Sequence, residues 1–206
     1  MDKRIKEYLD SPSKASSLAY WKSVSVSIPQ NMKVVREDLY NEKEYKGYSD
    51  VPYFKMVHRL QNVEKPELPN GFRLGDNNLL SLTEHINECY GESITIEELK
   101  EYEKRKTYDK DLWITIVNED SKVVATAIGE SDQEVKEGII EWVEVSKEYR
   151  KQGLGTYLVR ELLYRMNRKA SFVTVAGKLN SESQPIKLYQ KCGFIDEVIW
   201  HVLTKK

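Results

Sequence analysis

The sequence predicts a mixed α/β domain preceded by an N-terminal extension. From residue 72 onward, short β-branched runs alternate with segments whose apolar residues recur at helical spacing, a pattern typical of this fold class. Residues 65–71 read Lys-Pro-Glu-Leu-Pro-Asn-Gly, and such a run of turn-forming residues marks a loop between elements. We therefore expect an extension over residues 1–70, packed on a main domain over residues 71–206.

The extension is less periodic than the main domain. Residues 1–9 predict a short helix that stops at Asp10-Ser11-Pro12, and residues 53–60 predict a strand. Its large apolar residues are too many for a disordered segment and too few for a core of its own. We expect them to be buried against the main domain, or against a second copy of the chain.

The main domain opens with a short strand and two helices. Residues 72–74 read as the strand, and the apolar residues of 79–89 follow one helical face that ends near Gly91. Thr95 followed by Glu98 has the pattern of a capping box, so we expect the second helix to begin there.

The rest of the main domain alternates strands and helices. Residues 112–117 and 123–128 are β-branched runs joined by Asn-Glu-Asp-Ser, the pattern of a hairpin. Further strands are expected at residues 139–145, 172–175 and 194–203. Helices are expected at residues 154–168 and 183–192.

Composition narrows the function classes. The 32 Lys and Arg residues balance 33 Asp and Glu, so no basic field favours nucleic acid. No apolar run is long enough to cross a bilayer, and the N-terminus lacks a secretion signal. The two cysteines and three histidines have no metal-ligand spacing. We therefore expect no metal, no nucleic acid, no membrane and a cytoplasmic location.

The most informative stretch is residues 143–156, where a strand leads through a polar loop into a helix. Unpaired backbone N–H groups and the dipole at a helix N-terminus form an anion site suited to a pyrophosphate. Side chains at Gly153 or Gly155 would hold phosphates away from the backbone, and Arg150 and Lys151 add positive charge. The alternative is that both glycines merely shape a tight turn.

Two motifs then resemble one family. Arg150-x-x-Gly153-x-Gly155 after a strand resembles the acetyl-CoA signature of the GNAT superfamily of N-acetyltransferases. Residues 185–194 (Pro-Ile-Lys-Leu-Tyr-Gln-Lys-Cys-Gly-Phe) resemble its second motif, and the resemblance covers roughly residues 72–204. It implies a mixed, mostly antiparallel sheet with a splayed central strand pair and flanking helices. It also implies transfer of an acetyl group from acetyl-CoA to an amine.

The resemblance implies which residues hold acetyl-CoA. We call the turn of residues 150–156 the cradle. Backbone groups of the strand before it pair with the pantetheine amides, and the N–H of Val143 stabilises the oxyanion. The resemblance places the pyrophosphate on the backbone of residues 151–156. Position 182, where the family frequently has an asparagine, is glutamate here, so the contact falls to Asn180, Ser181 or Ser183, of which we name Asn180. The cofactor residues implied in this way are Val143, Glu144, Val145, Arg150, Lys151, Gln152, Gly153, Leu154, Gly155, Thr156 and Asn180.

Two catalytic roles follow from the resemblance. Tyr189 matches a family tyrosine that protonates the departing thiolate, although it can equally pack on the cofactor or core. Glu141 is the candidate base, because it is a carboxylate within an apolar strand and burial raises a carboxyl pKa. Alternatively, it is exposed or only recognises a cation. Glu144 should point to the opposite face unless a bulge shifts the register, and it remains a second candidate.

The sequence leaves the acceptor open. A polyamine, an aminoglycoside, an amino acid and a protein amine are all compatible with it, as are a monomer and a homodimer. The competing hypotheses are a non-catalytic acyl-CoA-binding sensor and an interaction module in which residues 1–70 are the functional part. Tyr189 and the cradle favour the enzyme. We also expect the extension to form one wall of the acceptor site.

Overall fold

The computed structural model describes residues 2–91, 94–181 and 183–206. The chain forms two compact units. The central unit comprises Leu60–Val173, and the terminal unit combines Met1–Arg59 with Thr174–Lys206. Strand β7 (Phe172–Lys178) begins in the first and ends in the second. Both units mix helices with antiparallel strands, which confirms the predicted fold class.

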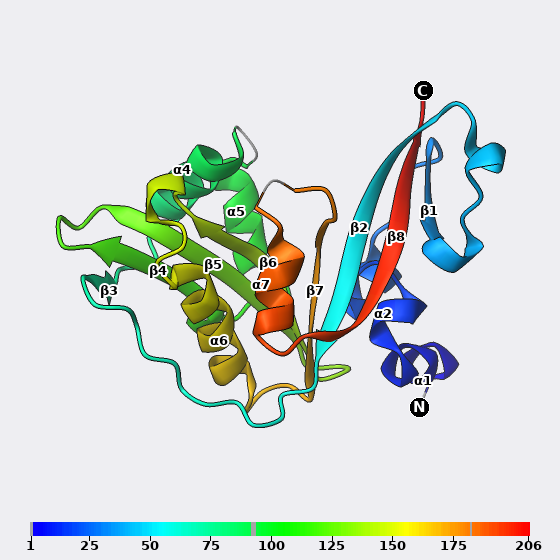
Figure 1. Ribbon diagram of the computed structural model, residues 1–206. Coiled ribbons are helices and arrows are strands. Elements are labelled where there is room, and N and C mark those ends of the chain that lie inside the picture. The colour runs from blue at the N-terminus through cyan, green and yellow to red at the C-terminus, as the bar shows by residue number, and fades with distance from the viewer. Residues whose placement is uncertain (1, 92–93, 182) are drawn as a thin grey trace. The chain divides into compact units, whose positions relative to one another are not determined.

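The central unit is built on four antiparallel strands in the order β6-β5-β4-β3 (Figure 1). The strands are β3 (Phe72–Leu74), β4 (Trp113–Asn118), β5 (Val123–Asp132) and β6 (Glu137–Val145). The helices are α4 (Leu79–Tyr90), α5 (Ile96–Glu103) and α6 (Leu154–Met166), with short 3-10 turns η3 (Lys110–Leu112) and η4 (Lys147–Tyr149). These elements confirm the strands, helices and hairpin expected from the sequence.

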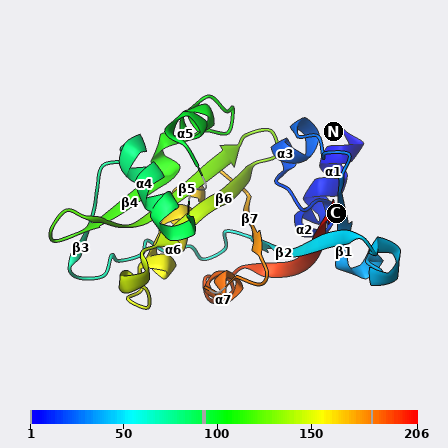
Figure 2. The same ribbon diagram turned by 90° about the horizontal axis from the view of Figure 1, so that it is seen from above.

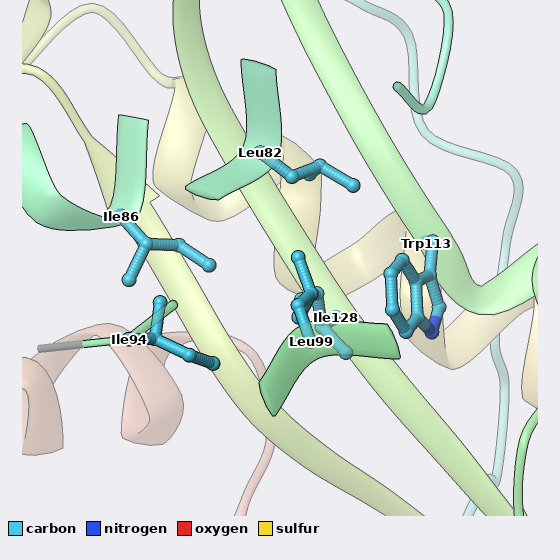
Figure 3. Packing of buried hydrophobic residues seen from close by; sticks show 6 residues of the cluster. All are labelled: Leu82, Ile86, Ile94, Leu99, Trp113 and Ile128. Atoms are coloured by element: carbon cyan, nitrogen blue, oxygen red, sulfur yellow. The ribbon is translucent and has the colours of Figure 1, made fainter. Parts of the chain in front are cut away.

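The helices of the central unit cover opposite faces of this sheet (Figures 1 and 2). Ile128 of β5 belongs to a buried cluster with α4 and α5 (Figure 3). Its neighbour Gly129 faces the other way, since a Cβ placed there would lie 2.6 Å from the methyl carbon of Met166 in α6. The cluster shown in Figure 3 comprises Leu82, Ile86, Ile94, Leu99, Trp113 and Ile128.

Local signals begin and end the two helices on the cluster side. The Asn78 side chain accepts hydrogen bonds from the first turn of α4, and Gly91 ends that helix at φ 81°. The Thr95 side chain and the Glu98 carboxylate cap each other's backbone at the start of α5, as the capping-box pattern predicts. These caps fix the residues at which α4 begins and ends and at which α5 begins.

The terminal unit contains four strands in the order β1-β8-β2-β7. Besides β7, the strands are β1 (Met32–Arg36), β2 (Tyr48–His58) and β8 (Ile195–Lys205). The helices are α1 (Lys3–Asp10), α2 (Pro12–Ala15), α3 (Tyr20–Ser25) and α7 (Pro185–Lys191), with turns η1 (Glu37–Leu39) and η2 (Glu42–Tyr45). Strand β8 lies between β1 and β2 and pairs antiparallel with both.

The beginning of the chain is thus integrated with its C-terminal elements. The buried ammonium of Lys55 in β2 donates hydrogen bonds to the Tyr8 hydroxyl (3.0 Å) and to the carbonyls of Ser16 (3.0 Å) and Leu18 (2.6 Å). These bonds tie the N-terminal helical segment to β2. The unit boundary falls after Arg59, a few residues before the loop that the sequence marks.

A histidine anchors the connection between β1 and β2. The His201 imidazole contacts the carboxylates of Asp50 and Glu37, at 2.7 Å each, and Tyr40 stacks on its ring at 3.7 Å. Burial alone would lower the pKa of His201, but the two carboxylates outweigh it and the net pKa is raised. None of the helices in the described residues is long and apolar enough to span a membrane.

Candidate active site

A β-bulge interrupts the strand that leads to the cradle. Ile128 pairs with Trp142 and the next residue, Gly129, pairs with Ile140, so Glu141 has no opposite residue on β5. An extra residue shifts the alternation of side chains beyond it. Glu144 lies opposite Thr126 and shares its face with Trp142. The structure therefore contains the bulge that the sequence analysis required for Glu144 to be a candidate base.

Glu144 is a buried carboxyl group with an incomplete set of partners. Glu144 is only 6% exposed, and its Oε1 atom has no hydrogen-bond partner among the described residues. Burial raises the pKa of Glu144 to about 7, against the opposing hydrogen bond from Tyr90 and the charge of Arg150. A carboxyl group that titrates near neutrality has the protonation behaviour of a general base.

Glu141, the base expected from the sequence, lies at the bulge itself and is only half-buried. The sequence argument rested on a carboxylate within an apolar strand, and that reasoning applies more strongly to Glu144. The role of Glu141 stays a prediction, and substitution of the two residues in parallel separates them.

A buried histidine connects α4 to β5 and to the end of β6, the strand that carries Glu144. The His85 ring nitrogens lie 2.9 Å from the Thr126 hydroxyl and 3.0 Å from the hydroxyl of Ser146, the residue that follows β6. Burial lowers the pKa of His85, so the ring is neutral near pH 7. His85 therefore fixes the end of β6 without adding charge beside Glu144.

Two more residues of α4 line this region. Burial, followed by the charge of Glu144, raises the pKa of the Cys89 thiol to about 12, and a protonated thiol is a poor nucleophile. Tyr90 is 58% exposed, and its ring meets that of Trp142 edge to face at 5.6 Å. The sequence alone gives no signal that marks His85 or Trp142 as part of this region.

The cradle has the backbone geometry of an anion site. Lys151 and Gly153 adopt left-handed conformations, at φ 63° and 88°, and Gly153 is the N-cap of α6 without a side-chain capping bond. The first N–H groups of the helix have no intrahelical acceptor. A Cβ at Gly153 would meet only Pro69 Cγ, at 3.5 Å. The space beside the turn is therefore open to a ligand such as a pyrophosphate.

The side chains of the cradle take different positions. Arg150 is exposed, and its Nε donates a hydrogen bond to the Val145 carbonyl at 3.1 Å. Gln152 Nε2 donates to the Glu148 carbonyl at 3.4 Å. Leu154 is buried in the core, whereas Gly155 and Thr156 are half-buried. Backbone N–H groups and basic side chains are thus the groups of this turn that face outward with positive potential.

Tyr189 and Asn180 belong to the terminal unit. Tyr189 is 7% exposed, and its ring contacts Phe54 at 5.9 Å and Phe194 at 5.4 Å. Asn180 is exposed in the turn after β7, and position 182 lies outside the described residues. The structure therefore brings together Glu141, residues 143–145 and the cradle within the central unit.

Comparison with known proteins assigns the class. The model of the acetyltransferase (GNAT) family matches residues 79–194, which include strands β4 to β7, the cradle and the Tyr189 motif. This chain belongs to the GNAT acetyltransferase family. The family is named for acetyl transfer. No curated protein shows a significant match to the sequence.

Solved structures share the fold at low sequence identity. A GCN5-related N-acetyltransferase from Sphaerobacter thermophilus is similar with a TM-score of 0.67 and 22% identity, over 83% of this chain and 58% of that one. A GNAT-family acetyltransferase from Colwellia psychrerythraea is similar with a TM-score of 0.60 and 14% identity, over 98% of this chain and 72% of that one. This chain thus corresponds to little more than half the length of the Sphaerobacter protein.

Proposed function

We propose that the protein transfers the acetyl group of acetyl-CoA directly to a primary amine, with Glu144 as the general base. The observation that carries this proposal is the buried Glu144 carboxyl, whose pKa is raised to about 7, on the strand that leads into the cradle. A module that only binds acyl-CoA has no need of a titratable group there. Family membership and the cradle support acetyl-CoA as the donor.

The residues take separate roles in this scheme. Bound acetyl-CoA supplies the thioester that the amine attacks, and residues 150–156 hold its pyrophosphate. Glu144 accepts the proton that the ammonium must lose before its nitrogen has a free lone pair. The nitrogen then adds to the thioester carbonyl, and the C–S bond breaks as the amide forms. Tyr189 donates a proton to the leaving sulfur and regains one from the nitrogen, which loses its second proton at this stage, and the proton on Glu144 passes to solvent. We keep the proposal that residues 1–70 contribute a wall of the acceptor site.

The test is the pH dependence of kcat/KM in parallel variants. For the wild-type protein we expect the rate of thiol release to rise with pH through about 7, because Glu144 acts only when it is deprotonated. Glu144→Gln should lose roughly 10²–10⁴-fold in turnover together with this limb of the profile.

The matched control is Glu141→Gln, which changes a less buried carboxylate three positions away on the same strand. It should keep the limb near pH 7. An unchanged profile in Glu144→Gln, with the limb lost in Glu141→Gln instead, would assign the base to Glu141. Thermal-shift titration with acetyl-CoA checks that both variants still bind the donor.

A further inference from the structure

Two buried polar atoms without partners lie on one face of β6, next to the bulge. They are the indole Nε1 of Trp142 and the carboxyl Oε1 of Glu144, neither of which has a hydrogen-bond partner within the described ranges. Trp142 and Glu144 are two residues apart beyond the bulge, so their Cα atoms are roughly 7 Å apart and their side chains share a face. One atom is a donor and the other is an acceptor.

This face is the one that α4 and α5 cover. Ile128, opposite Trp142, belongs to the cluster shown in Figure 3. Thr126, opposite Glu144, is bonded to His85 of α4. Tyr90, at the end of α4, contacts both residues, through its ring to Trp142 and through its hydroxyl to the Glu144 carboxyl. Tyr90 is 58% exposed and Glu144 only 6%, so their common neighbour Tyr90 reaches the surface of the central unit while the two polar atoms are buried beneath it.

Buried polar atoms in native proteins are nearly always hydrogen-bonded, and an unpaired one calls for an explanation. A ligand that satisfies both atoms must present a donor to Glu144 and an acceptor to Trp142, because the indole N–H can only donate. A simple alkylamine or polyamine carries donors alone when protonated and leaves the indole unpaired. An amine with an oxygen acceptor on the neighbouring carbon satisfies both atoms at once.

We infer that the acceptor substrate is an α-amino amide, such as the N-terminus of a peptide, with its ammonium on Glu144 and its carbonyl oxygen on the Trp142 indole. This inference rests on the proposed function and names its substrate class. A free amino acid fits less well, because its carboxylate would bring a second negative charge beside Glu144. A hydroxyl in place of the carbonyl brings a proton that needs an acceptor of its own.

Proton transfer favours the same class. An α-amino group has a reference pKa of about 7.7–8.0, against about 10.4 for the alkylammonium of lysine. Glu144, with a pKa of about 7, therefore deprotonates an α-amino group against a roughly tenfold unfavourable equilibrium. For an alkylammonium the corresponding factor is roughly 10³. The hydrogen-bonding pattern and the acidity of the base thus select the same amine.

The experiment compares two amines that differ only by the carboxamide, L-leucinamide and 3-methylbutylamine. Their kcat/KM values are measured by thiol release in the wild-type protein and in Trp142→Phe, which removes the indole N–H and keeps an aromatic ring. We expect the variant to lose at least tenfold more kcat/KM for L-leucinamide than for 3-methylbutylamine, since a buried hydrogen bond is lost only with the former. Comparison of the two losses cancels the difference in amine pKa.

The matched control is Trp113→Phe. Trp113 presents an indole on β4, in the buried cluster and opposite Ile128, so its loss should affect both amines equally. Equal losses for both amines in Trp142→Phe would overturn the inference and leave the proposed function standing. A dependence of L-leucinol on Trp142 as large as that of L-leucinamide would overturn the assignment to a carbonyl. If the wild-type protein acetylates other primary amines but not L-leucinamide, the inference falls and the proposed function stands. Binding of acetyl-CoA without acetylation of any primary amine in a broad panel would overturn the proposed function, and the inference with it.

Discussion

Glu144→Gln should stabilise the folded protein at alkaline pH while it removes activity. Burial raises the pKa of Glu144 from 4.5 to about 7, a difference of about 2.5 units. At 1.36 kcal/mol per unit, the ionised carboxylate costs the folded state about 3 kcal/mol at pH 8. Glutamine keeps an acceptor for the Tyr90 hydroxyl and carries no charge, so the variant avoids this cost.

The pH dependence gives the effect its sign. Because the folded-state pKa lies above the unfolded one, the stability contributed by this carboxyl is fully present below pH 4.5 and is lost as the pH rises through about 7. We expect the variant to gain about 1 kcal/mol or less over the wild-type protein at pH 5 and about 3 kcal/mol at pH 8. For a chain of this size, the larger gain corresponds to a rise in Tm of roughly 6–12 °C.

The assay is thermal unfolding of both proteins without ligand at pH 5, 6.5 and 8. Any constant effect of the buried amide cancels when the gap in Tm is followed across pH. A gap that stays the same from pH 5 to pH 8 would refute the raised pKa and, with it, the argument for Glu144 as the base. Glu141→Gln, in which the substituted side chain is half-buried, serves as the control and should show a smaller change.

Three further substitutions test other parts of the structure. Gly153→Val forces a β-branched residue to φ 88° in the cradle, so it should abolish the stabilisation by acetyl-CoA. In the wild-type protein this stabilisation reaches about 2.7 kcal/mol at a hundredfold excess over Kd. An unchanged thermal shift in the variant would contradict the cradle assignment. Tyr189→Phe should lower kcat roughly 10²–10⁴-fold with little change in CoA affinity, and equal turnover would leave the ring packing on Phe54 and Phe194 as its role. Leu99→Ala removes a fully buried side chain from the cluster over β5 and should cost about 2–5 kcal/mol of unfolding free energy in denaturant titrations.

Much of the central unit could be predicted from the sequence because its signals are local. The capping box at Thr95, the periodicity of α6 and the Asn-Glu-Asp-Ser turn each act within a few residues. Strand β1 was not predicted, because its five residues are half-buried or exposed and show no strict alternation. It is held by pairing with β8, which is far away in sequence.

The site was predictable in outline but not in its acid–base detail. The glycines of the cradle can be read directly from the sequence. The difference in burial between Glu144 and Glu141 depends instead on a one-residue bulge. No rule of alternation predicts that bulge from one sequence. That the Trp142 indole has no hydrogen-bond partner among the residues the structure describes is equally unpredictable before the neighbours of the strand are known.

The position of β8 between β1 and β2 has a consequence for synthesis. Strand β2 ends at His58 and β8 begins at Ile195, so 136 residues separate them. At about 5–20 residues per second, the ribosome needs roughly 7–30 s to supply the partner of the first two strands. During that interval β1 has no native mate and β2 lacks its pairing with β8, with its other neighbour β7 completed only at Lys178, while the contiguous central unit has all of its own strands β3–β6. The exposed nascent strands are therefore the segment most open to chaperones and to pairing with other chains.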